Sequence, residues 1–572
     1  MRRKTLLILL FCILAVIPFL GTFDYNTKGE PREAIVSLNM LESGNWIMPR
    51  NSVGEIAYKP PLFHWTIAAV STIGGEVTEF TSRIPSAIAF ILLTVITYVF
   101  VRRRTDEVTA LLTTAVTFTG YELHRMGFNC RVDMLLTLFI VAAMYGLYKW
   151  HERGMKGIPW LAILMMSLGT LTKGPIGALL PCLVTGVYLL LRRVKFIKAL
   201  LWMMAIGTLS LIIPACWYLA AYQQAGDEFL QLMMEENVGR MTSNMTYKVH
   251  VEPWYMNFLY LLMGMAPWTL LALLSLGWLH YRPLRKVKFQ TVRKKAGKWL
   301  AAVPPLHLYA LTAVVIITVF FCIPECKRSV YLMPLYPFLS YLVARYLLRM
   351  ARKHQCPLGI YAGFLSVVGI ILTLSFIILK FVSLPPTLFH GRNGYDNYEM
   401  AKNLSSYNGI IPWVIILATL AACIVWWKWR KRHNNGKAYL KAIVAMTLLI
   451  YLCFDGALKP AILNAKSQKH IAERIETLVP PEKGQLYEYI EKGVKAKGDP
   501  VHFYELNFYM HDRIDNFHTK KPKSGYLLIG NDDAQLRMAE FQNEGYHFKL
   551  LYDSADEPVL KQTLQLYQFW KD

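Results

Sequence analysis

Residues that could bind an anion gather near the start of the chain, in a polar stretch between two apolar runs. This stretch, residues 23–65, carries Glu30 and Arg32 on a segment with helical apolar spacing, and then Lys59 directly before two prolines. An acid-bearing interfacial helix and a cation held by a stiff Pro-Pro pair predict a site for an anionic group at a lipid surface. The competing interpretation is a solvated connecting loop.

Further acids lie on the same helix and at the end of a later apolar run. Glu33 and Glu42 are expected to face solvent, as most surface charges do. Glu30 would be favoured by the dipole of the helix that it begins. Asp133 stands at the mouth of an apolar run, where an acid is costly unless it is paired or wet. It therefore either pairs with Arg131 or faces a polar cavity.

Five cations lie in loops that we expect on the outer face of a membrane, where the positive-inside tendency predicts few. They are Lys59, Lys173, Arg240, Lys327 and Arg328. Two or three of them together would hold a phosphate through charge-assisted hydrogen bonds. Alone, each would reach lipid head groups by snorkelling.

The elements that must position these residues are membrane helices. With 572 residues, 54% hydrophobic and 17% charged, the chain is too apolar for an ordinary soluble protein. The apolar runs predict about thirteen transmembrane helices. They are residues 5–21, 82–101, 107–124, 133–150, 157–174, 176–192, 199–221, 257–279, 302–322, 330–348, 358–381, 410–427 and 438–456.

The loops between these runs predict the orientation of the chain. The most basic loops all fall on one side, which is then the cytoplasm, and the candidate site residues fall on the other. The formal net charge of +24 lies mostly in those loops, so it does not indicate nucleic-acid binding.

The pattern changes after the last run. Period-2 stretches mix with helical ones, so residues 457–572 predict a small α/β domain on the outer side, behind a transmembrane domain of residues 1–456 with interfacial helices in its 22–81 loop. The expected strands are 485–490, 501–506, 525–530, 547–552 and 564–569, and the expected helices are 467–478 and 532–544.

The nine cysteines are scattered and form no CxxC or CxxH pair, so we expect no metal site. Cys322 and Cys326 bracket a short loop. A disulfide between them, or from either to Cys130, is left open by the sequence.

Several short motifs share the predicted outer face and lie in a fixed order. They are residues 29–34 with 40–46, 58–65, 82–87, 131–137, 171–175, 236–240 and 327–337. With these motifs, the first 350 or so residues resemble the GT-C membrane glycosyltransferases. The resemblance is to the aminoarabinose–lipid A transferases and to the protein mannosyltransferases that use polyprenyl-phosphate sugars.

The resemblance implies a polyprenyl-phosphate sugar donor and transfer with inversion, without a cofactor and without a required divalent cation. The acceptor would be lipid A, or another envelope glycan or protein, at the periplasmic face of a bacterial inner membrane. Membrane lipids would be the other partners. The alternatives are an O-glycosyltransferase for protein or glycan, a transporter of lipid-linked sugars, and a non-catalytic scaffold. The absence of matched broken helices in two halves argues against the transporter.

The resemblance also assigns roles to residues. Lys59 would contact the donor phosphate, with Arg240, Lys327 and Arg328 completing the clamp, and Glu30 and Asp133 would be the acids of the site. Within the same motifs, Arg32, Lys173 and Tyr331 are further candidates.

The chain departs from the family pattern at two positions. The family usually has an acidic pair where this chain has Gly29 and Glu30, so either Glu30 acts alone or Asp24 contributes. An acid often precedes the Lys-Pro-Pro motif, and here Tyr58 replaces it, which weakens the case for a metal.

Overall fold

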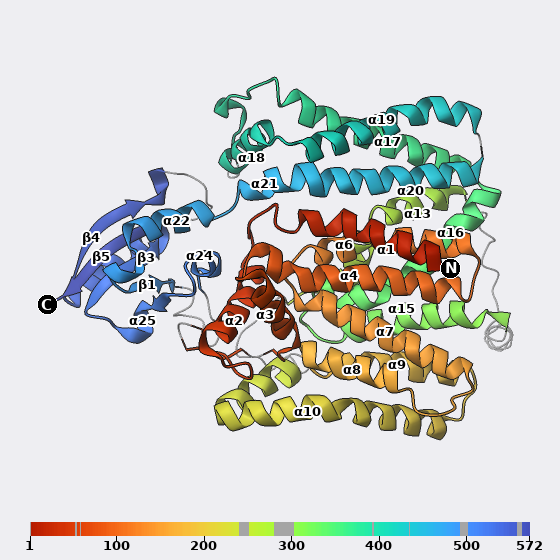
Figure 1. The fold of residues 1–572 in the computed structure, drawn as a ribbon, viewed down its shortest axis with the longest axis horizontal. Helices are drawn as coiled ribbons and strands as arrows, with labels where there is room; N and C mark the ends of the chain where they lie inside the picture. The colour runs from red at the N-terminus through yellow and green to blue at the C-terminus, as the bar shows by residue number, and fades with distance from the viewer. Residues whose placement is uncertain are drawn as a thin grey trace.

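Long apolar helices form the larger part of the molecule and run side by side (Figure 1). The computed structural model describes residues 2–51, 54–57, 59–239, 251–278, 302–391, 394–433, 435–491, 502–556 and 563–572. Among these residues, seven helices are long and apolar enough to cross a membrane. They are α4 (Glu79–Arg102), α7 (Val132–Glu152), α10 (Phe196–Met234), α15 (Pro305–Cys322), α17 (Cys356–Ile378), α19 (Ile410–Arg432) and α20 (Gly436–Cys453).

Each of the thirteen predicted spans overlaps a helix, but several of these helices are shorter than the apolar run. A bent pair, broken by 105°, counts as an eighth span if its two halves are taken together. The remaining helices in the predicted runs are α1 (Arg2–Val16), α5 (Glu107–Phe118), α8 (Trp160–Lys173), α9 (Ile176–Leu191), the bent pair α12 (Met256–Gly264) and α13 (Trp268–Ser275), and α16 (Tyr336–Lys353). The protein is therefore a polytopic membrane protein.

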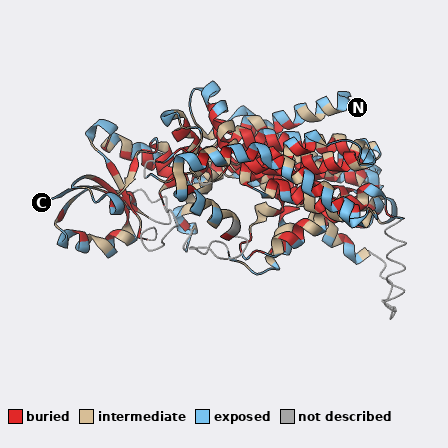
Figure 2. Ribbon diagram, turned by 90° about the horizontal axis from the view of Figure 1, so that it is seen from below, coloured by how far each residue is buried: buried red, intermediate tan, exposed pale blue. Residues whose placement is uncertain are grey.

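The apolar surface of the bundle is arranged as a membrane would require. Buried residues concentrate where the helices meet (Figure 2). Many large apolar residues of the bundle are nevertheless exposed. Helix α10 is the clearest case, because only 22% of its most apolar 18-residue segment is buried within the protein. Lipid would cover these faces.

The predicted interfacial helix forms as α2 (Gly29–Ser43), and Gly44 ends it in the left-handed conformation, with a φ of 68°. With α3 (Leu62–Gly74), it lies between the helical bundle and the sheet domain (Figure 1). Both Glu30 and Glu33 are only 2% exposed. The expectation that Glu33 faces solvent was therefore wrong, whereas Glu42 is exposed as predicted.

The C-terminal residues form a five-stranded sheet in the order β2-β1-β3-β5-β4. Strand β1 pairs in parallel with β2 and β3, and β5 is antiparallel to both β3 and β4. The strands are β1 (Leu486–Tyr489), β2 (Ile514–Asn516), β3 (Ser524–Gly530), β4 (Tyr546–Asp553) and β5 (Leu564–Lys571). Separate apolar clusters cover the two faces of the sheet, so this part has its own core.

Four of the five expected strands are present, and the expected strand at 501–506 was wrong. Helix α24 (Tyr504–Tyr509) forms there instead, because Tyr504 and Phe508, one turn apart, pack together against Tyr25, Ala34 and Ile35. The sheet domain is thereby docked on α2. The continuous helix that begins with α20 runs to Asn464, beyond the predicted domain boundary at residue 456.

Shorter elements complete the described chain. They are α6 (Tyr121–Gly127), α18 (Gly394–Ser406), α21 (Lys459–Asn464), α22 (Lys469–Leu478), α25 (Phe517–Lys520), α26 (Asn531–Asn543), the π-helices η2 (Glu235–Gly239) and η6 (Phe454–Leu458), and the 3₁₀ turns η1 (Ile17–Phe19), η3 (Leu276–Trp278), η4 (Ser329–Leu335), η5 (Pro386–Leu388), η7 (Pro481–Lys483) and η8 (Ser554–Asp556).

Candidate active site

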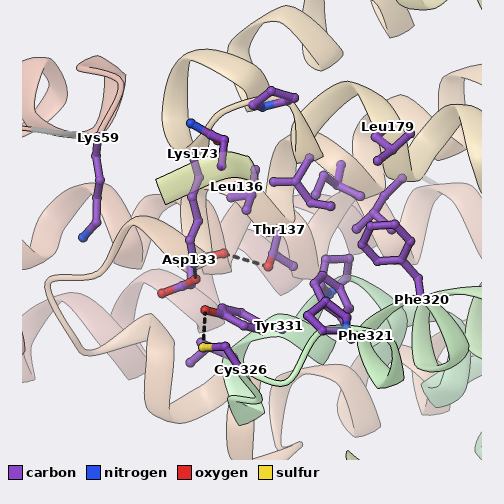
Figure 3. A pocket seen from close by; sticks show the side chains of 18 of the residues that line it. Lys59, Asp133, Leu136, Thr137, Lys173, Leu179, Phe320, Phe321, Cys326 and Tyr331 are labelled. Carbon is purple, nitrogen blue, oxygen red and sulfur yellow. Dashed lines mark hydrogen bonds and ion pairs between the residues drawn. The ribbon is translucent and has the colours of Figure 1, made fainter. Parts of the chain in front are cut away.

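A cavity of about 220 Å³ opens among α7, α8, α9, α15 and η4 (Figure 3). Its lining divides by chemistry. Charged and polar residues line one part: Lys59, Asp133, Thr137, Lys173, Glu236, Asn237 and Tyr331. Apolar residues make up the rest of the lining: Pro60, Leu136, Ile140, Pro175, Ile176, Leu179, Leu180, Phe320, Phe321, Pro324, Cys326, Val330 and Pro334. Of these, Leu179 and Phe320 lie away from Lys59 and Asp133, whereas Cys326 lies beside Tyr331 (Figure 3). Such a cavity fits a ligand with an ionic head and a hydrocarbon tail.

The turn between α8 and α9 places Lys173 at the polar part of the cavity. Gly174 has a φ of 85°, a conformation that favours glycine, and it ends α8 directly after Lys173. Helix α9 then packs closely against α8, because a Cβ on Gly177 would lie 2.3 Å from the carbonyl carbon of Gly169. The Lys173 ammonium pairs with Asp133 and lies 4.8 Å from the centre of the Tyr331 ring.

Asp133 lies in the first turn of α7 and is 8% exposed. Of the two alternatives for this acid, the polar cavity is the one that the structure supports, because its direct partner is Lys173. Arg131 and Lys59 also interact electrostatically with its carboxylate. A buried acid in this position is stabilised by several cations, as a membrane interface requires.

Lys59 precedes the two prolines that lead into α3, the second of which is the N-cap of that helix, and it reaches the cavity from the other side (Figure 3). Its ammonium pairs with the buried carboxylate of Glu33. The same carboxylate lies 2.9 Å from Nε2 of His64 and 3.5 Å from the guanidinium of Arg32. Burial would raise the pKa of Glu33, but Lys59, His64 and Arg32 outweigh it and hold this pKa well below its usual range.

Glu30 lies outside the lining of the cavity and forms a buried ion pair with Arg83 of α4. Two guanidinium nitrogens donate to its two oxygens at 2.9 and 3.2 Å, and the backbone N–H of Cys130 donates to Oε1 at 2.8 Å. Arg83 also donates to the carbonyls of Leu20 and Phe23, at 2.8 and 2.6 Å. The pair ties the first outer loop to the bundle. The acid of α2 that pairs with a cation of the cavity is Glu33, whose partner is Lys59.

The remaining predicted residues are divided. Tyr331 lines the cavity, whereas Lys327 and Arg328 do not. Lys327 is 4% exposed and donates to the carbonyl of Pro324 at 2.6 Å. Arg32 does not line the cavity either, but its guanidinium pairs with the carboxylate of Glu33, the partner of Lys59. Arg240 lies outside the described residues, as does Tyr58.

The sequence analysis missed four residues of the site. Glu236 and Asn237 line the cavity, Glu33 pairs with Lys59, and His64 contacts Glu33. Glu236 and Asn237 stand in the same motif as Arg240, and η2 brings them to the cavity wall. His64 follows Lys59 in its motif. All four therefore lie within recognised motifs, and only their burial and direction were unpredicted.

No group of three or more His, Cys, Asp or Glu side chains that could hold a metal occurs among the described residues. The absence of a required cofactor stays a prediction. All nine cysteines are free, so none of the disulfides left open by the sequence forms.

Comparisons with known proteins find similar sequences and a similar fold. A family model described as dolichyl-phosphate-mannose-protein mannosyltransferase matches residues 58–218. A protein of Aquifex aeolicus is 29% identical over 353 residues, which span 61% of this chain and 64% of that protein. An undecaprenyl phosphate-alpha-4-amino-4-deoxy-L-arabinose arabinosyl transferase of Shewanella sediminis is 23% identical over 534 residues, which span 92% of this chain and 88% of the relative.

The fold is that of a solved protein, ArnT from Cupriavidus metallidurans. Its apo structure superposes with a TM-score of 0.69 at 17% identity and covers 99% of this chain and 98% of its own. The structure with bound undecaprenyl phosphate gives a TM-score of 0.68, also at 17% identity, over 98% and 97% of the two chains. In its motifs, its relatives and its fold, the chain is therefore similar to the membrane glycosyltransferases that include the aminoarabinose transferases and the protein mannosyltransferases.

Proposed function

We propose that the protein transfers a sugar from a polyprenyl-phosphate donor to lipid A at the periplasmic face of the inner membrane. The observation that carries the proposal is the two-part cavity, with Lys59, Lys173 and Asp133 at one part and aliphatic and aromatic residues at the other. A polyprenyl phosphate has the matching division between anion and hydrocarbon. The solved relative with bound undecaprenyl phosphate supports this class of donor.

In this reaction, an oxygen of the acceptor attacks the anomeric carbon from the face opposite the phosphate. The bond between this carbon and the phosphate oxygen breaks, and its electron pair stays on the departing polyprenyl phosphate. Lys59 and Lys173 stabilise the charge that develops there. In the absence of donor, Glu33 and Asp133 hold these ammonium groups in place, so they need little reorganisation when the phosphate binds.

The acceptor decides what Asp133 must do. A phosphate of lipid A is already an anion and needs no base, so Asp133 would orient the sugar and Lys173. A hydroxyl would need Asp133 as general base, because its proton must be removed as it attacks. The match to a protein mannosyltransferase model favours the hydroxyl alternative, with a protein or glycan as acceptor. The similarity to an arabinosyl transferase over 92% of this chain favours transfer of aminoarabinose instead, and for this sugar we propose lipid A as the acceptor.

The orientation belongs to the proposal as well. The basic loops predicted for the cytoplasm leave residues 22–81 and the sheet domain on the periplasmic side. A test is to place single cysteines at Asn45, which is partly exposed, and at Arg153, which is exposed and expected on the opposite side. The exposed native cysteines Cys216 and Cys356 are first replaced by serine, and intact cells are labelled with an impermeant maleimide. Labelling at residue 45 alone would support this orientation, and labelling at residue 153 alone would refute it.

Reconstitution tests the reaction itself. Purified protein in liposomes is incubated with undecaprenyl-phosphate aminoarabinose and lipid A, and the lipids are analysed by mass spectrometry. Glycosylated lipid A with an equal amount of free undecaprenyl phosphate would support the proposal. A transporter would move the donor across the bilayer and release no undecaprenyl phosphate. Release only with a peptide or glycan acceptor would replace lipid A with a hydroxyl acceptor.

A further inference from the structure

A guanidinium group is seated on Gly29, at the point where the family pattern has an acid. If Gly29 carried a Cβ, this atom would lie 2.1 Å from Nη1 and 2.5 Å from Cζ of Arg131. The Arg131 side chain therefore occupies space that exists only because residue 29 has no side chain. Its backbone is fixed, since the hydroxyl of Ser86 donates to the Arg131 carbonyl at 3.1 Å at the start of α7.

Arg131 differs from the other cations near the site in its partners. Lys59 pairs with Glu33, Lys173 with Asp133, and Arg83 with Glu30. The three acids Glu33, Asp133 and Glu30 are thus already paired with other cations. Within the described part of the chain, the Arg131 guanidinium forms no hydrogen bond or ion pair.

The position of Arg131 relates it to the reaction. It lies outside the lining of the donor cavity, yet it interacts electrostatically with Asp133, which lines that cavity. Asp133 thus has Lys173 as its cavity partner and Arg131 as a second cation two residues away in sequence. The side chain is half-buried, so water is partly excluded but a ligand can reach it.

We propose that Arg131 binds the phosphate of the acceptor and positions it for attack on the donor. This inference rests on the proposed function and deepens it, because it names the group that selects a phosphate acceptor. A guanidinium presents paired N–H donors that match two oxygens of a phosphate monoester. The bound phosphate keeps a third oxygen for the bond to the anomeric carbon, and no proton has to be removed.

The test separates binding from transfer. Lipid A and the same lipid after phosphatase treatment are titrated into the wild type and into Arg131→Gln in nanodiscs. Undecaprenyl phosphate is titrated in parallel as a probe of the donor site. Gly29→Ala keeps the arginine and adds the Cβ that its guanidinium excludes. Arg50→Gln is the matched control, because Arg50 is a half-exposed arginine of another outer loop and pairs with Glu228.

For the wild type we expect tighter binding of phosphorylated lipid A. Arg131→Gln should weaken this binding by about 10- to 100-fold, the usual range for a charged hydrogen bond, with undecaprenyl phosphate affinity unchanged. Gly29→Ala only displaces the end of the arginine side chain, so it should weaken the same binding by a smaller factor. Arg50→Gln should alter neither. Equal binding of the two lipids by the wild type, or loss of undecaprenyl phosphate affinity in Arg131→Gln, would overturn the assignment. Preferential binding without any transfer would instead refute the proposed function and leave Arg131 as an anion site.

Discussion

Replacing Lys59 by alanine removes a cation that has two tasks. Its ammonium lines the donor cavity and also neutralises the buried carboxylate of Glu33. The sequence alone suggests that Lys59→Ala leaves the fold intact, because an outer loop is not expected to be core. The structure changes this expectation, since the Lys59 side chain is 15% exposed and that of Glu33 is 3% exposed.

The two tasks predict two separate losses. Without Lys59, a buried ion pair is broken, which typically costs about 3–5 kcal/mol of unfolding free energy. The lower end applies here, because His64 at 2.9 Å and Arg32 at 3.5 Å still face the carboxylate. Loss of one group that stabilises the leaving phosphate should lower kcat by about 10²–10³-fold.

The double variant Lys59→Ala/Glu33→Gln separates these losses, because it removes the charge that was left buried. We expect it to recover most of the stability in denaturant unfolding of the detergent-solubilised protein, while kcat for transfer from undecaprenyl-phosphate sugar stays low. Glu33→Gln alone is the control for the carboxylate. If kcat returned together with stability, Lys59 would act only through the fold, and its contact with the donor phosphate would be refuted.

Three further variants test the other assignments. Asp133→Asn should lower kcat by about 10²–10⁴-fold with a hydroxyl acceptor and much less with a phosphate acceptor, as parallel assays would reveal; equal, negligible effects would remove Asp133 from the site. Glu30→Gln should cost about 3–5 kcal/mol in unfolding but leave kcat of the folded fraction unchanged, and a specific loss of kcat would restore Glu30 as a catalytic acid. His502 is buried, which opposes its charge, but Glu488 and Glu55, the latter at 3.3 Å, raise its pKa to about 10. Since this pKa is raised from 6.5, the stabilisation is complete below pH 6.5 and is lost as the pH rises through about 10. Amide hydrogen exchange around residue 55, corrected for its intrinsic dependence on pH, should therefore accelerate in the wild type as the pH rises through about 10. Exchange in His502→Gln that stays slow at every pH would contradict this.

Several features of the fold could be predicted because they depend on local composition. An apolar run of about twenty residues has no favourable state but a buried or membrane helix, so each of the thirteen runs contains one. Strands at 525–530 and 564–569 were likewise predictable from local pattern. The first is a short apolar run that is buried on both faces, and the second alternates buried and more exposed residues. The helix at Tyr504 was not, because its packing against Ile35 joins residues far apart in the chain.

The candidate site shows the same division. The sequence by itself singled out Asp133 and Lys173, which lie at the ends of apolar runs, because charges there are costly unless they have a function or a partner. It singled out Lys59 as a cation directly before two prolines in the polar stretch. Which partner each obtains depends on how α2, α4, α7 and α8 pack, and no spacing along one segment contains that information. Tertiary structure alone decided that Glu30 pairs with Arg83, away from the cavity, and that Glu33, buried one turn later, pairs with Lys59 of the cavity.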